Sequence, residues 1–147
     1  MLRRLLRVAC IGALLAGPVG PAVAAEADIG AELPACTDKT YVQQIRSQYD
    51  FAESMREGHP IAAMDAVEEA GLGAPPESAN QYATETTRVV GSRYCTASLK
   101  LDDGSTDTLL WRLDYVRDND EHYIRYDHCS DRHDTFEDKC AAYRPPE

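Results

Sequence analysis

The sequence has little basic charge, no long apolar run after residue 25, and no closely spaced pair of cysteines. Its 147 residues contain 15 Lys and Arg against 25 Asp and Glu, a formal net charge of −10. This balance argues against nucleic-acid or anionic-lipid partners, which are bound by concentrated basic faces. No later stretch approaches the roughly 20 apolar residues that a membrane span requires, so no span is expected. Without a two-residue-spaced cysteine pair, a redox-active thiol is also disfavoured.

The first 25 residues have the organisation of a secretion signal. Arg3, Arg4 and Arg7 precede a short apolar run over residues 8–16, and small residues follow up to Ala25. This order predicts a signal peptide over residues 1–25, with cleavage after Ala25 or, as the alternative, after Ala24. The remaining 122 residues carry twelve basic and twenty-five acidic side chains, a formal charge of −13. We therefore expect an acidic protein that is periplasmic or secreted from the cell.

Four cysteines remain in the expected mature chain: Cys36, Cys95, Cys129 and Cys140. An oxidising compartment favours structural disulfides, and four cysteines allow three connectivities. Cys95 alternates with apolar residues of a predicted strand and faces the predicted helix, whose first turn carries Cys36. Cys129 and Cys140 enclose a short polar segment. These placements predict Cys36 paired with Cys95, and Cys129 paired with Cys140.

One helix is predicted at the start of the mature domain. Residues 26–35 lack periodicity and are interpreted as a flexible lead-in, followed by a single small domain over 36–147. From Thr37 or Asp38, apolar residues recur at helical spacing up to Met55, and Gly58 with Pro60 predicts the stop. The stretch 61–72 is ambiguous between helix and strand, and its propensity weakly favours helix. Residues 71–80 are predicted to form a surface loop.

The second half of the chain predicts strands. Alternating residues indicate strands over 84–101, 109–115 and 122–129, with acidic turns between them. Pairing the first two places Ala97 opposite Trp111 and Leu99 opposite Leu109, with Ile124 and Tyr126 inward on the third. The fold class is α+β: an N-terminal amphipathic helix packed on one face of a three- to four-stranded antiparallel meander sheet, with two disulfides. This order of elements resembles cystatin-like folds in topology alone, which implies no function.

Candidate metal sites and catalytic groups are present but carry no diagnostic spacing. A zinc site could use His128, Cys129, His133 and Cys140, although disulfides compete for the thiols. The turns at 102–107 and 118–121 lack the spacing of a calcium-binding loop. The residues that could serve as general acid or base are His122, His128, Asp114, Asp127, Glu68 and Glu69. Asp114 and Asp127 are expected on the solvent face of the sheet, where carboxylates make poor general bases. The sequence therefore predicts no catalytic, cofactor or metal residue, and no cofactor.

Two functions remain open at this level. The first is a non-enzymatic accessory or binding module that acts on a protein partner through its surface. The alternative is a small-molecule binder or small enzyme with a cavity between helix and sheet. That cavity would be lined by tyrosines: Tyr94, Tyr115, Tyr123 and Tyr126.

Overall fold

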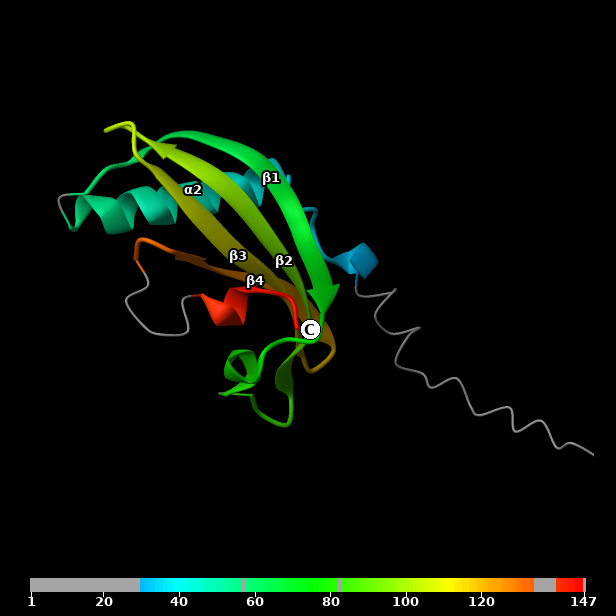
Figure 1. The fold of residues 1–147 in the computed structure, drawn as a ribbon. Coiled ribbons are helices and arrows are strands. Elements are labelled where there is room, and N and C mark those ends of the chain that lie inside the picture. Colours follow the sequence, from blue (N-terminus) through cyan, green and yellow to red (C-terminus); the bar gives the residue numbers. More distant parts are fainter. Residues whose placement is uncertain (1–29, 57, 82, 134–139, 147) are drawn as a thin grey trace, which may run out of the picture.

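The computed structural model describes residues 30–56, 58–81, 83–133 and 140–146. The predicted signal peptide and residues 26–29 of the predicted lead-in lie outside the described residues. The elements follow in the order α2 (Lys39–Ser54), β1 (Ile61–Gly73), η1 (Glu77–Asn80), β2 (Thr87–Leu101), β3 (Thr106–Asp118), β4 (Glu121–Ser130) and η2 (Ala141–Tyr143). The four strands form one antiparallel sheet in chain order, and α2 lies against one of its faces (Figure 1).

Helix α2 begins where the sequence predicts but ends at Ser54, before the predicted stop at Gly58 and Pro60. The Asp38 carboxylate accepts a hydrogen bond of 2.9 Å from the Thr40 N–H, as an N-cap does. Ile45 and Tyr49, one turn apart, are buried against the sheet. Two positions differ from the predicted pattern: Met55 is 72% exposed because it follows the last turn, whereas Glu53 is only 2% exposed. Glu53 faces inward because hydrogen bonds compensate its buried charge, as described below.

Residues 61–73 form strand β1, so the weak preference for helix in this stretch was wrong. The strand pairs with β2 through three irregularities in register, and Ala66 has a positive φ of 50°. Alanine and glutamate favour helices, but pairing with β2 overrides this local preference. The bulges also break strict alternation, which removed the period-two signal from the sequence. The predicted loop at 71–80 accordingly starts later, after Gly73.

The sheet has the predicted inward faces but a different register between its central strands. Ala97 lies opposite Leu109, and Leu99 lies opposite Asp107, two residues from the predicted pairing. A shift of two preserves which face each side chain occupies, so the apolar sets still meet. Ile124 and Tyr126 pack against the core as expected.

The main core lies between α2 and the sheet. Its buried residues come from both layers: Leu33, Cys36, Ile45, Tyr49, Ile61, Cys95, Ala97, Leu99, Leu101, Leu109, Trp111 and Leu113. Cys36 and Cys95 are at disulfide distance, with Cα atoms 5.6 Å apart, so this pair links the two layers. Leu33 is buried although the sequence assigned it to the flexible lead-in, because its side chain joins this core.

The opposite face of the sheet, here called the far face, is crossed by residues 140–146, which we call the strap. Cys140 is paired with Cys129 of β4, again with Cα atoms 5.6 Å apart. At the other end of the strap, Pro145 and Pro146 lie over Gly71 and Gly73 of β1. A Cβ on Gly71 would stand 3.0 Å from the Pro145 Cβ, so glycine permits this close approach. The strap therefore spans the sheet from one edge strand to the other.

Candidate functional site

A buried ion network lies at the centre of the far face. Asp114 of β3 is 1% exposed, which corrects the expectation that it is solvated. Arg112 donates to both oxygens of this carboxylate, at 2.6 and 3.1 Å, and Ser92 Oγ donates at 2.7 Å. Arg125 of β4 adds a contact of 2.9 Å from its guanidinium. A buried carboxylate requires such compensation, since desolvation penalises its charge.

The same two arginines hold the segments that cover this face. The third guanidinium nitrogen of Arg112, Nη1, donates to the Ala142 carbonyl of the strap. Arg125 donates at 3.0 Å to the Ala79 carbonyl in η1. The Arg112 guanidinium also lies 5.5 Å from the centroid of the Tyr143 ring. Burial of Asp114 is therefore a consequence of the strap and η1 closing over the sheet.

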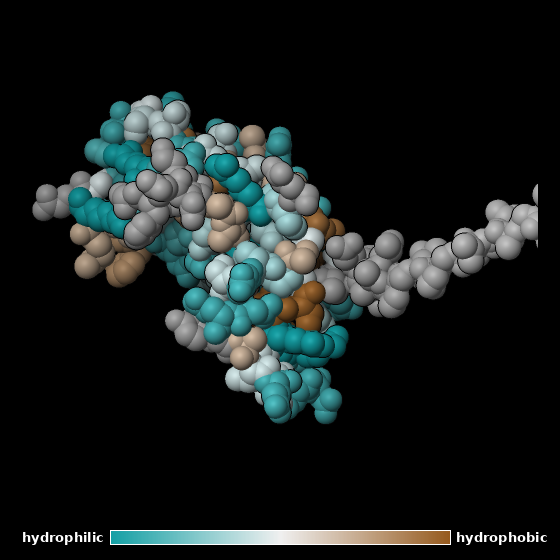
Figure 2. Space-filling view, turned by 60° about the horizontal axis from the view of Figure 1, so that its bottom comes forward, coloured by the Kyte–Doolittle hydropathy of each residue, from teal (hydrophilic) through white to brown (hydrophobic). Residues whose placement is uncertain are grey.

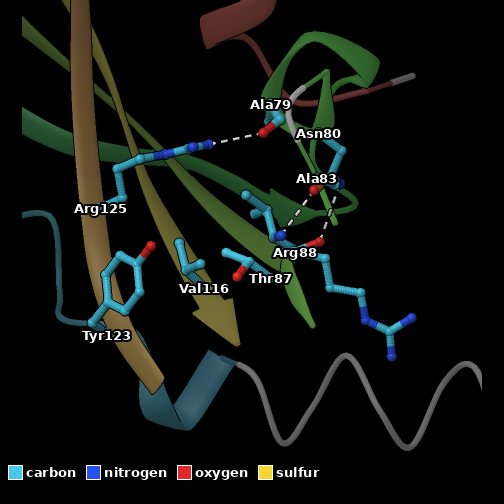
Figure 3. Close-up of a pocket in the computed structure, with 9 residues that line it drawn as sticks. Ala79, Asn80, Ala83, Thr87, Arg88, Val116, Tyr123 and Arg125 are labelled. Carbon is cyan, nitrogen blue, oxygen red and sulfur yellow. Dashed lines mark hydrogen bonds between the residues drawn. The ribbon is translucent and has the colours of Figure 1, made fainter. Parts of the chain in front are cut away.

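Between η1 and the strap lies a groove, which we call the far-face groove. Its larger hollow has a volume of about 360 Å³. The residues that line it are Ser78, Ala79, Gln81, Arg112, Arg125, Tyr126, Asp127, Ala142 and Tyr143. A smaller hollow of about 50 Å³ shares Ala79 and Arg125 with the larger one, and the hydrogen bond between these two residues is drawn in Figure 3. Figure 3 shows Tyr123 and Val116 on the strand side and Asn80 on the opposite wall.

The chemistry of the far-face groove is that of a binding site. Arginine keeps its charge throughout the physiological pH range and offers fixed donors. Burial raises the pKa of Tyr143 above its ordinary value, and its hydrogen bond to Asp127 acts in the same direction. That phenol therefore remains protonated at neutral pH. The donors at this site are suited to holding a ligand rather than to transferring protons.

A second polar cluster lies at the end of α2. Glu53 accepts a hydrogen bond of 2.7 Å from the His59 N–H and pairs with the His133 imidazole. Burial opposes the charge on Glu53, but these hydrogen bonds outweigh it and hold its pKa below the usual value. The His133 ring stacks on Tyr49, with centroids 4.8 Å apart. A hollow of about 250 Å³ adjoins Glu53, His59 and His133.

The structure does not bring together the four residues considered for zinc. Cys129 and Cys140 are within disulfide distance of each other, and His133 pairs with Glu53. His128 lies opposite Trp111 on β3, and burial lowers the pKa of its imidazole.

The acid–base candidates are also dispersed. His122 stacks on Tyr115 at 5.3 Å, whereas Asp127 accepts from Tyr143. Glu68 and Glu69 are exposed on β1.

The four tyrosines proposed for a cavity are likewise separated. The Tyr94 hydroxyl donates to the Ala74 carbonyl, whereas Tyr115 and Tyr126 pack against the main core. Tyr123 is 48% exposed at the smaller hollow. The core side chains named above pack between α2 and the sheet. The hollows of the far-face groove lie on the opposite face from the cavity that the sequence suggested.

Sequence reasoning missed the roles of Arg112, Asp114 and Arg125. A signal was nevertheless present in β3, where Leu110 and Val116 share the far face with Arg112 and Asp114. Apolar residues on both sides of a charged pair indicate a covered face rather than a solvated one.

Comparison with protein-family models, with curated proteins and with solved structures finds no match. Among the described residues, no helix is long and apolar enough to cross a bilayer. The two cysteine pairs at disulfide distance are consistent with an oxidising environment. Functional inference therefore depends on the geometry of this chain alone.

Proposed function

We propose that the protein is a small exported binding module whose far-face groove holds a polar segment of a protein partner. The observation that supports this proposal is the larger hollow, where Arg112 and Arg125 are fixed by the buried carboxylate of Asp114. Donors that are already ordered lose little conformational freedom when a ligand binds. A recess of about 360 Å³ is in the range of ligand sites, and its walls offer hydroxyl, amide and guanidinium groups.

The described surface offers few large apolar side chains for docking. The exposed large hydrophobic residues are Phe51, Met55, Leu72 and Tyr123. On the face shown in Figure 2, hydrophilic residues predominate and brown atoms occur in small patches. Polar recognition in the groove is therefore favoured over an extensive hydrophobic interface.

Site-specific photo-cross-linking in the native compartment tests this function. A photoreactive residue at Gln81, on the groove rim, should capture one recurring protein, whereas the same residue at exposed Ala62 on β1 should not. Ser78→Trp, which fills the groove, should abolish the Gln81 product, and Ser47→Trp on the exposed side of α2 should not. Identical products from Gln81 and Ala62, or only uncross-linked monomer from both, would contradict the proposal.

A further inference from the structure

Three side chains that could ligate a metal, those of His59, Asp102 and Asp103, lie within reach of one another. The α2–β1 connection and the β2–β3 turn, which carry them, lie at the opposite end of the sheet from η1 and the strap (Figure 1). His59 lies between α2 and β1, and Asp102 and Asp103 lie in the turn between β2 and β3. The His59 Nδ1 is 2.8 Å from Asp102 Oδ1, and its Nε2 is 3.4 Å from Asp103 Oδ2. One ligand atom from each residue lies within 4.8 Å of the others. Residues separated by more than forty positions in sequence thus converge at one point.

Hydrogen bonds fix the backbone of His59 and Asp102 and the side chain of Asp103. The backbone N–H of His59 donates to Glu53, and the backbone N–H of Asp102 donates at 3.1 Å to the Pro60 carbonyl. Ser105 donates to Asp103 Oδ1 from both its N–H and its hydroxyl, at 2.8 and 2.6 Å. This leaves Asp103 Oδ2 directed at His59. Such outer contacts are the usual means of orienting metal ligands.

The contacts of His59 with Asp102 and Asp103 are both favourable only if a cation is present, either on the ring or bound beside it. A neutral imidazole has one N–H, so it can donate to only one of the two carboxylates. The other ring nitrogen then presents a lone pair to a carboxylate oxygen, which is repulsive. A metal ion bound between nitrogen and oxygen atoms removes this repulsion, as does a second proton on the ring. The other charged or titratable groups that line the adjoining hollow are Glu53, Arg56, Arg132 and His133.

We propose that His59, Asp102 and Asp103 form a Zn²⁺ site. Imidazole nitrogen and carboxylate oxygen are both zinc ligands, and three protein ligands with water in the remaining position are a common set. Calcium and magnesium take oxygen ligands, so the imidazole favours a transition metal. All three side chains are at least 31% exposed, which leaves the ion a path of entry. The site is independent of the far-face groove and of the function proposed for it.

Isothermal titration of the chelator-treated, tag-free protein with Zn²⁺ tests the site. We expect one equivalent to bind, the melting temperature to rise, and Ca²⁺ to produce neither effect at the same concentration. His59→Ala and Asp102→Asn should each weaken Zn²⁺ binding at least about tenfold. Ser105→Ala removes one of the two hydrogen bonds that hold Asp103 and should weaken Zn²⁺ binding by less than His59→Ala does.

His122→Ala is the matched control, because His122 is an exposed histidine on β4. Its Zn²⁺ affinity should equal that of the unaltered protein. The NMR resonances of the His59 ring nitrogens should shift on Zn²⁺ addition at a fixed pH of 7.5. A change of pH cannot cause this shift, because the pH is held constant. The proposal is overturned if Zn²⁺ at about 100 μM does not bind, or if His59→Ala and Asp102→Asn, both folded by circular dichroism, bind it unchanged.

Discussion

Asp114 is the residue on which the organisation of the far face depends. Its two oxygens accept from Ser92, Arg112 and Arg125, and each arginine also holds a covering segment through a carbonyl. The carboxylate thus couples the middle of the sheet to η1 and to the strap. Because Asp114 is buried with its partners, removing it leaves a charge without compensation rather than a vacant surface position.

Asp114→Ala should lower the free energy of unfolding by about 3 kcal/mol, as expected for breaking a buried ion pair by removing one partner. Asp65→Ala is the control, because Asp65 is exposed on β1 and should change stability by less than about 0.5 kcal/mol. Urea unfolding with the disulfides intact measures both. Equal effects from the two substitutions would refute the role given to the network.

His128 should make the fold sensitive to mild acid. Burial lowers its pKa in the folded protein, while the unfolded chain takes up a proton near the ordinary value of about 6.5. Below that pH the unfolded state binds more protons, so the free energy of unfolding falls as the pH is lowered toward the folded-state pKa.

Unfolding at pH 7.5 and 5.5 checks this expectation. The unaltered protein should lose more stability between the two conditions than His128→Gln does. Glu53 is not the source, since its depressed pKa places its stability loss below about pH 4.5. His122→Ala should behave as the unaltered protein does. An identical pH response in His128→Gln would exclude His128 as the cause.

At the scale of elements, hydrophobic periodicity predicted the helix and strands that bury a single face. Helix α2 and the inward residues of β2, β3 and β4 were predictable because each buries a single apolar stripe against one core. Strand β1 was not, since its bulges and its alanine and glutamate content conceal the strand period. The register was missed by two residues because the same face is apolar in either pairing, and only the geometry of the turn decides.

The strap depends on the absence of side chains beneath it. Gly71→Val places a branched side chain where Pro145 lies and should displace the end of the strap while leaving the main core folded. Amide exchange at Tyr143 and Arg144 should then accelerate by about tenfold, as a local opening does. Ala70→Val is the control, because Ala70 is exposed at the adjacent position. Unchanged exchange in Gly71→Val would show that these contacts do not hold the strap.

At the scale of the whole molecule, the sequence indicated the cysteine pairs better than it indicated a site. The cysteine pairs now found at disulfide distance are the pairs that strand direction and proximity suggested. The far-face groove could not be predicted, because it arises where η1 and the strap, remote in sequence, meet over the same strands. Periodicity within a segment does not indicate that η1 and the strap cover the far face. The convergence of His59 with Asp102 was hidden for the same reason.

The two cysteine pairs should stabilise different parts of the molecule. Replacing Cys36 and Cys95 by alanine should lower the free energy of unfolding by about 4 kcal/mol, because this pair closes the longer loop. Replacing Cys129 and Cys140 should lower it by about 3 kcal/mol and also accelerate amide exchange in the strap.

Urea unfolding of both double variants measures the order of the two stability losses. Peptide mapping of the unreduced protein checks the cysteine pairing. A larger loss from the Cys129 and Cys140 variant would contradict the order. A mapped peptide joining Cys36 to Cys140 would contradict the pairing itself.

The sheet has two unlike edges, and this difference limits how copies of the chain could associate. Strand β1 is interrupted by bulges, a left-handed residue at Ala66 and acidic side chains, all of which discourage further strand pairing. Strand β4 pairs with β3 in uninterrupted register and has no strand on its outer side among the described residues. Joining two β4 edges would give a closed two-fold dimer, and the remaining β1 edges would stop growth. The bulged and acidic strand β1 therefore opposes filament formation by successive strand addition.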